Sequence, residues 1–114
     1  MGAVRLQSPE AVAALASLAQ EHRLAAFREL VAAGPDGRSA GALAERLGIP
    51  ASSLSFHLVQ LARSGLVSSE RRSRHIIYRA DFATMNALLA YLLDNCCSGA
   101  ACEVEIQTLR SACK

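Results

Sequence analysis

Apolar residues recur at helical spacing along most of the chain. Residues 8–19 are rich in alanine and leucine, and Ser8-Pro9-Glu10 at their start is typical of a helix N-terminus, with Ser8 as the expected cap. A second set recurs three, three and one positions apart, which predicts an amphipathic helix. This set is Leu24, Phe27, Leu30 and Val31. The Gly-Pro-Asp-Gly run at 34–37 is a turn sequence and should end that helix.

Two shorter helices follow, separated by a glycine. Ser39 can cap the first of them, which should end at Gly48. The second should run from about residue 52 to residue 64 and end at Gly65. Its leucines lie at i, i+4 and i+7 and define one buried face. They are Leu54, Leu58 and Leu61. Two short helices joined by a tight turn form a helix-turn-helix pattern.

The next residues predict a small β-hairpin and a last helix. Residues 66–71 and 75–79 have strand character, and the tip between them is basic. Asp81 can cap the last helix, which should end near Asn95 and has one apolar side. That side comprises Phe82, Met85, Leu88, Leu89 and Leu92. The expected fold class is mainly α with a small β-hairpin, which is a winged helix-turn-helix.

Composition supports one folded domain. At 114 residues, 52% hydrophobic and 19% charged, the chain should form a single domain over 1–114, with a core at about 8–95 and a cysteine-containing tail at 96–114. Only five aromatic residues are present, so the core is thin and support from a partner subunit is expected. Neither a secretory signal nor a membrane-length apolar run is evident. We therefore expect a cytoplasmic protein, whose cysteines serve as free thiols, metal ligands or redox groups rather than as stable structural disulfides.

Charge is informative in its distribution. The net charge is only +2, but residues 63–79 contain five arginines and a single glutamate. A local basic stripe is what contact with DNA phosphates requires, and serine, glutamine and phenylalanine can contact base edges or thymine methyl groups. The candidate DNA contacts are Ser53, Ser55, Phe56, His57, Gln60, Arg71, Arg72 and Arg74. His57 also fits a histidine at the edge of the core that bonds a neighbouring helix, and the three arginines also fit a solvated turn.

The stretch at 54–67, LSFHLVQLARSGLV, resembles the recognition-helix signature of the ArsR family of bacterial repressors. His22-Arg23-Leu24 with Phe27 resembles the second helix of that family, and Tyr78 its second wing strand. The resemblance implies a homodimer formed through the first and last helices. It also implies a double-stranded, palindromic operator and repression that an inducer relieves. The family usually carries a second histidine where Phe56 stands, and often a glycine at the wing tip.

Three of the four cysteines fall within seven positions: Cys96, Cys97 and Cys102. Many members of the family carry a cysteine-rich sensor before the recognition helix, but residues 38–44 contain no thiol. The CC-x4-C arrangement instead resembles a subset of arsenical sensors. Adjacent helical residues point about 100° apart, so convergence of the paired thiols needs the helix break at Ser98-Gly99. Three thiolates suit As(III) or Sb(III), whereas zinc needs a fourth ligand, from Cys113 or water.

The sequence leaves several hypotheses open. The favoured one is a repressor, with no permanent cofactor, that arsenite, antimonite or a methylated arsenical releases from DNA. Its rivals are a cadmium- or lead-responsive repressor and a thiol-redox switch in which Cys102 pairs with Cys96 or Cys97. Inert cysteines and a thiol carrier without DNA binding are further alternatives. An enzyme is not expected, because no Cys/His/Asp triad or phosphate-cradling loop is evident.

Overall fold

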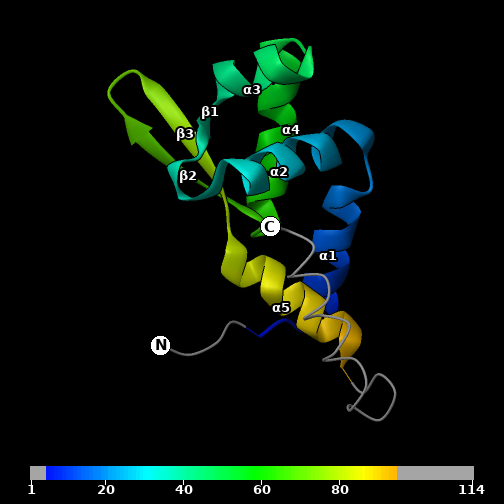
Figure 1. Cartoon of the computed structure of the whole chain (residues 1–114). Helices are drawn as coiled ribbons and strands as arrows, with labels where there is room; N and C mark the ends of the chain where they lie inside the picture. Colours follow the sequence, from blue (N-terminus) through cyan, green and yellow to red (C-terminus); the bar gives the residue numbers. More distant parts are fainter. Residues whose placement is uncertain (1–4, 95–114) are drawn as a thin grey trace.

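The computed structural model describes residues 5–94. Within them lie five α-helices, one 3-10 helix and three strands (Figure 1). The α-helices are α1 (Ser8–Leu18), α2 (Glu21–Ala33), α3 (Ala40–Leu47), α4 (Ala51–Arg63) and α5 (Phe82–Leu93). The 3-10 helix η1 is Gly34–Asp36, and the strands are β1 (Arg38–Ser39), β2 (Val67–Arg72) and β3 (His75–Ala80). The winged helix-turn-helix fold predicted from the sequence is confirmed.

The sheet contains one strand more than the predicted hairpin. Its order is β1-β3-β2 and both pairings are antiparallel, with Arg38 opposite Tyr78 and Arg72 opposite His75. The two-residue strand β1 begins directly after Gly37, which has a φ of +67°. A Cβ at Gly37 would overlap the carbonyl oxygen of Tyr78. Glycine therefore lets the chain turn out of η1 and approach β3 closely enough to pair.

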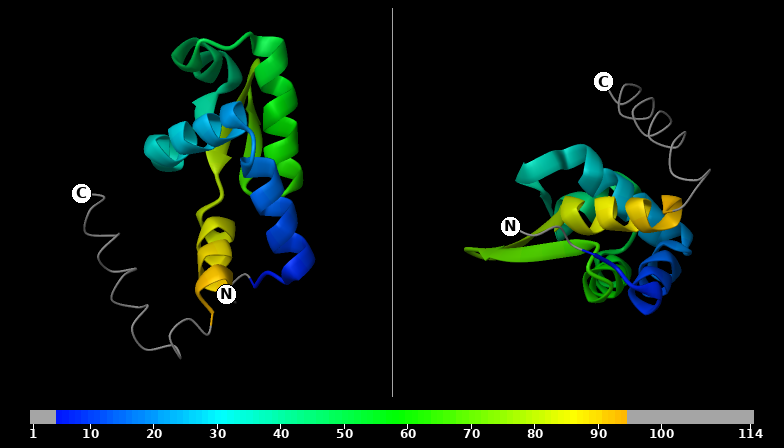
Figure 2. Two further views of the ribbon diagram at one scale, coloured as in Figure 1. Left: turned by 90° about the vertical axis from the view of Figure 1, so that its right-hand side faces the viewer. Right: turned by 90° about the horizontal axis from the view of Figure 1, so that it is seen from below.

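The core lies between α2, α3, α4 and the base of the sheet. Its largest fully buried side chains are Leu30, Leu43, Leu54, Leu58, Leu61 and Leu66. The three leucines predicted to form the buried face of α4 are all among them. At the other end of the molecule, α1 and α5 lie side by side, away from α3 and the hairpin tip (Figure 2). The fold therefore separates the helix-turn-helix and wing from the α1–α5 pair.

Hydrogen bonds at the helix ends confirm two predicted caps and correct a third. The Ser39 hydroxyl oxygen accepts from the Ala42 N–H at 3.1 Å, and the Asp81 carboxylate accepts from the Thr84 N–H at 3.0 Å. Ser8, however, is the first residue of α1 and Gln7 is its cap. The Gln7 N–H donates to the Glu10 carboxylate at 2.8 Å. Because Glu10 satisfies that N–H, α1 begins one residue earlier than the Ser8 cap required.

Candidate nucleic-acid interface

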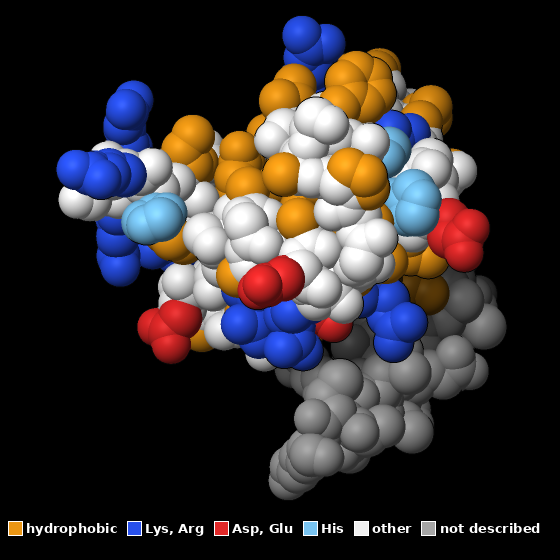
Figure 3. Space-filling view, turned by 90° about the horizontal axis from the view of Figure 1, so that it is seen from above, with side chains coloured by type: hydrophobic (Ala, Val, Ile, Leu, Met, Phe, Trp, Pro, Cys, Tyr) orange, Lys and Arg blue, Asp and Glu red, His pale blue; other side chains and the backbone are white. Residues whose placement is uncertain are grey.

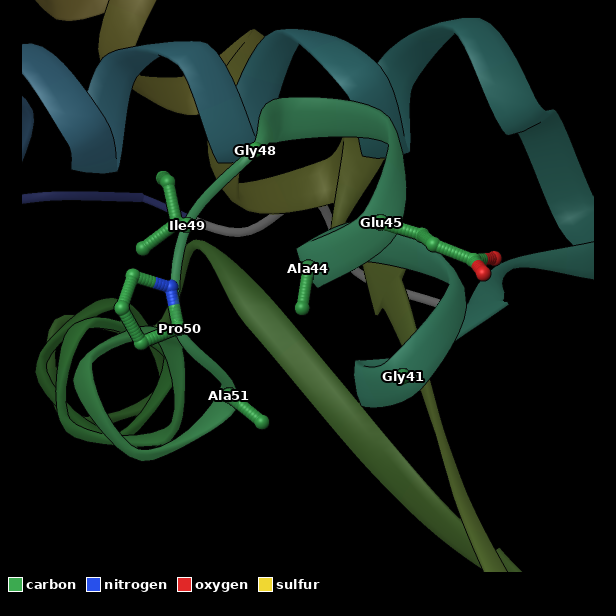
Figure 4. Close-up of a pocket in the computed structure, with 7 residues that line it drawn as sticks. All are labelled: Gly41, Ala44, Glu45, Gly48, Ile49, Pro50 and Ala51. Carbon is green, nitrogen blue, oxygen red and sulfur yellow. The ribbon is translucent and has the colours of Figure 1, made fainter.

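The two helices of the helix-turn-helix meet at a short, tight turn. Gly48 ends α3 with a φ of +66°, and Pro50 precedes α4. An open hollow at this turn is lined by small or apolar residues together with Glu45, whose carboxylate extends away from Pro50 and Ala51 (Figure 4). Its lining residues are Gly41, Ala44, Glu45, Gly48, Ile49, Pro50 and Ala51. Glu45 is the one ionisable residue in this lining, so the hollow is a feature of the turn and does not have the groups of a reactive site.

One face of α4 is open to solvent. At about 100° per residue, the direction opposite the buried leucines is occupied by residues that recur at i, i+4, i+7 and i+11. They are Ser52, Phe56, Val59 and Arg63, all of them exposed, and we call them the outward stripe. Ser53 and Ser55 flank this stripe and are exposed as well. Val59 was not among the candidate contacts predicted from the sequence, although its i+3 spacing from Phe56 indicates that the two side chains share one face of the helix.

His57 and Gln60 are half-buried, and His57 lies on the side of α4 that contacts α2. The His57 ring lies beside that of His22, at the start of α2, with their centroids 5.7 Å apart. Its Nδ1 is buried and has no hydrogen-bond partner within residues 5–94. Burial lowers the pKa of His57, and the nearby charges of Arg23 and His22 lower it further. The lowered pKa favours the neutral form of the imidazole, which lies against His22 of α2.

The hairpin tip carries a group of exposed arginines. Arg71, Arg72 and Arg74 are all exposed, and Ser73 makes the turn with a φ of +58°. Arg72 lies 3.6 Å from the Glu70 carboxylate, whereas Arg71 and Arg74 form no ion pair within the described part of the chain. In Figure 3, basic side chains gather over the hairpin while apolar side chains lie in the open on the same face of the molecule. Two of the three predicted arginines are thus free to contact an anion.

Arg79 has a structural role instead. Its guanidinium lies 2.8 Å from the Glu70 carboxylate, and its Nε donates to the Pro35 carbonyl oxygen at 2.8 Å. The hydrogen bond from Arg79, followed by the charge of Arg72, holds the pKa of Glu70 below its ordinary value. Arg79 therefore fixes the base of the wing to η1.

The predicted cysteine site lies outside the described residues. Cys96, Cys97, Cys102 and Cys113 all follow Asp94, the last residue that the structure describes. Within 5–94, no group of three or more histidine, cysteine or acidic side chains is arranged to hold a metal ion. The same range contains no helix that is both long and apolar enough to cross a membrane.

The helix-turn-helix, the exposed face of α4 and the arginine-tipped hairpin define a winged helix-turn-helix DNA-binding protein. A family model described as "Helix-turn-helix domain" matches residues 18–70. The HTH-type transcriptional regulator YgaV of Escherichia coli strain K12 is 31% identical over 94 residues, which cover 82% of this chain and 93% of that protein. The chain belongs to the ArsR family of transcriptional regulators, as two solved structures also indicate.

The first of these structures is an ArsR-like transcriptional regulator from Rhodococcus sp. RHA1. It superposes with a TM-score of 0.67 at 31% identity, over 91% of this chain and 92% of that one. The second is the homodimeric winged helix-turn-helix DNA-binding domain of Mb0332 from Mycobacterium bovis, with a TM-score of 0.61 at 28% identity, over 76% and 81% of the two chains. These relatives are described as transcriptional regulators and DNA-binding domains, which is the class that the geometry defines.

Proposed function

We propose that the protein is a homodimeric repressor that binds operator DNA and is released when trivalent arsenic binds Cys96, Cys97 and Cys102. The observation that carries the proposed DNA binding is that the outward stripe of α4 and the arginines of the hairpin tip are both exposed. Arg71 and Arg74 form no ion pair within residues 5–94. A recognition helix in the major groove, with a basic wing on the phosphates, uses both features at once.

Exposed apolar side chains support a dimer through α1 and α5. These two helices contact each other and leave large apolar residues in solvent. The residues are Val12 and Leu15 on α1 and Phe82, Leu89, Tyr91 and Leu92 on α5. Several large exposed apolar side chains on two adjacent helices are typical of an interface. A second copy covering it would give a two-fold arrangement, whose recognition helices need a separation of about 34 Å to enter successive major grooves.

The end of α5 supports a link between the cysteines and that interface. Helix α5 ends at Leu93, and Asp94 has extended backbone angles. The cysteine pair begins at Cys96, two residues after Asp94. At the other end of the interface helices, the Ser17 hydroxyl of α1 is hydrogen-bonded to the hydroxyl of Ser64, which ends α4, at 2.9 Å. Arsenic drawing three thiolates together would reposition α5, and the contacts of α1 with α4 would carry the change to the recognition helix.

The test is operator binding followed by fluorescence anisotropy under reducing conditions. Arsenite should release the wild-type protein and should fail to release Cys102→Ser, while Cys113→Ser should respond like the wild type. Zinc, cadmium, lead and peroxide are the comparison ligands. If peroxide or cadmium releases the protein and arsenite does not, the arsenic assignment is wrong. If Cys113→Ser alone abolishes release, the choice of three ligands is wrong.

A further inference from the structure

Phe56 is the most exposed large apolar side chain of α4. Its exposed fraction is 60%, and it lies at the centre of the outward stripe. A phenyl ring carries no hydrogen-bonding group, so it can contact neither phosphates nor the polar base edges productively. The one apolar group that B-DNA displays in its major groove is the C5-methyl of thymine. An exposed phenylalanine on a recognition helix therefore fits a thymine methyl group better than any other feature of the groove.

The Phe56 ring is supported from one side. His57 packs edge-on against it, with centroids 6.0 Å apart and an interplanar angle of 64°. His57 in turn lies against His22 of α2, so three rings run from the scaffold to the exposed face. A ring restrained before binding loses less conformational freedom on contact with a ligand. His57 is thus a positioning residue for Phe56.

Val59 extends the apolar surface along the same face. It is 45% exposed and lies three residues after Phe56, which places the two side chains next to each other. Ser52, Ser55 and Arg63 lie next to them on the exposed side of α4 and form their rim. On a separate element, Arg71 and Arg74 at the hairpin tip are exposed and form no ion pair within residues 5–94. The rim of this apolar pair is thus polar and cationic, which complements a polyanion rather than an apolar protein surface.

We propose that Phe56 and Val59 read thymine methyl groups, so that the operator is recognised in part through C5-methyl contacts in each half-site. The inference rests on the proposed DNA-binding function and deepens it, because it names the chemical group that the recognition helix selects.

The test replaces thymine by uracil, which removes the methyl group and leaves base pairing intact. An operator is first isolated by repeated selection from random duplexes, and uracil is then placed at each thymine of both half-sites in turn. The wild-type protein should lose about fourfold in affinity for each contacted methyl group removed, and about fifteenfold when a symmetric pair is removed. Phe56→Ala should bind the thymine and uracil operators equally at the positions that Phe56 contacts, and it should keep a preference only at positions contacted by Val59. Phe56→Leu should retain a preference for thymine.

Leu24→Ala is the matched control, since Leu24 is 45% exposed but lies on α2. It should keep the wild-type preference for thymine. Thermal unfolding of Phe56→Ala confirms that the variant is folded, and the uracil scan on the wild-type protein needs no variant at all. If uracil is tolerated at every position, or if Phe56→Ala keeps the preference at every position, the inference is wrong and the proposed function stands. If selection enriches no sequence, both are wrong.

Discussion

His57 lies where the buried and exposed sides of α4 meet, and its surroundings explain both hypotheses that the sequence allowed for it. The ring faces His22 of α2 and supports Phe56, while its Nδ1 is buried without a partner within residues 5–94. It therefore belongs to the packing between α2 and α4 at the same time as it borders the DNA-facing surface. A direct contact of His57 with DNA stays a prediction. The packing of His57 against α2 should first affect the stability of the fold.

The lowered pKa of His57 predicts a specific dependence of stability on pH. The unfolded chain protonates this imidazole near its ordinary pKa of 6.5, whereas the folded protein resists protonation because of burial and the charges of Arg23 and His22. The free energy of unfolding should therefore be highest above pH 6.5, fall as the pH drops towards the lowered pKa, and level off below it. Urea unfolding between neutral pH and about pH 5 measures this.

His57→Gln is the control for that measurement, because glutamine keeps a polar side chain of similar length without titrating. Its free energy of unfolding should decline less than that of the wild type over the same interval. Parallel declines in the two proteins would show that other groups cause the pH dependence.

Gly37 and Gly41 form a matched pair for testing backbone strain. Gly37→Ala forces alanine into a φ of +67° and a Cβ against the Tyr78 carbonyl, so it should lower the free energy of unfolding by about 1–3 kcal/mol or more. Gly41 lies in α3 with open space around its Cα, so Gly41→Ala should be neutral or stabilise by up to about 1 kcal/mol. Equal losses in urea unfolding would contradict the account of how β1 reaches β3.

At the scale of elements, regular spacing of apolar residues and capping residues in the sequence predicted the helices. The leucines of α4 at i, i+4 and i+7 and the caps Ser39 and Asp81 were sufficient to place the helices. Strand β1 was not predictable in this way, because two residues are too few to show alternation and its pairing depends on Gly37 next to a distant strand.

The exposure of the candidate DNA contacts was predicted in part for a similar reason. Positions 53, 55 and 56 are exposed as expected, but the half-burial of His57 depends on where α2 crosses α4, which spacing within α4 does not reveal. Gln60 is also half-buried. The difference in role between Arg79 and the arginines at the tip also depends on tertiary structure, because Arg79 contacts Pro35, which is distant in sequence. The cysteine tail stays a prediction, because it lies outside the described residues.

The wing predicts how salt affects DNA binding. If Arg71 and Arg74 contact phosphates in both subunits, each Arg→Gln substitution removes two contacts per dimer. The slope of log K against log salt concentration should then fall by about 1.8 for each substitution. Operator titrations over a range of salt concentrations measure this slope.

Arg79→Gln is the contrasting variant, because Arg79 bonds Glu70 and Pro35 rather than projecting into solvent. It should lower stability and leave the salt slope nearly unchanged. A larger change of slope for Arg79→Gln than for Arg71→Gln would place the phosphate contacts at the base of the hairpin instead of at its tip.

At the scale of the whole molecule, the proposed dimer would connect the proposed thiol site with DNA binding. The α1–α5 pair lies at one end of the molecule, whereas α3 and the hairpin tip lie at the other (Figure 2). The α1–α5 end leaves apolar residues exposed in a single copy. Because the proposed thiol site directly follows α5, a ligand there would act on the dimer interface rather than on the DNA surface itself.

Charge placed at this end should therefore dissociate the dimer. Leu89 and Leu24 are exposed to similar extents, 46% and 45%, but only Leu89 lies on the proposed interface. Leu89→Glu should shift the protein to monomer in sedimentation velocity and weaken operator binding, since one monomer reaches one half-site. Leu24→Glu should remain dimeric. Dimerisation of Leu89→Glu at wild-type strength would remove α5 from the interface.

The most direct test of the central claim is reciprocal coupling between arsenic and operator DNA. Arsenite affinity is measured for the free protein and for the operator complex, and operator affinity is measured with and without arsenite, all under reducing conditions. Linkage requires the two factors to be equal, and a typical coupling of about 1–3 kcal/mol corresponds to roughly 5- to 150-fold. We expect operator DNA to weaken arsenite affinity, and arsenite to weaken operator affinity, by equal factors in this range. Neither change should occur in Cys102→Ser. Arsenite that binds the free and DNA-bound protein equally tightly, without releasing the operator, would contradict it.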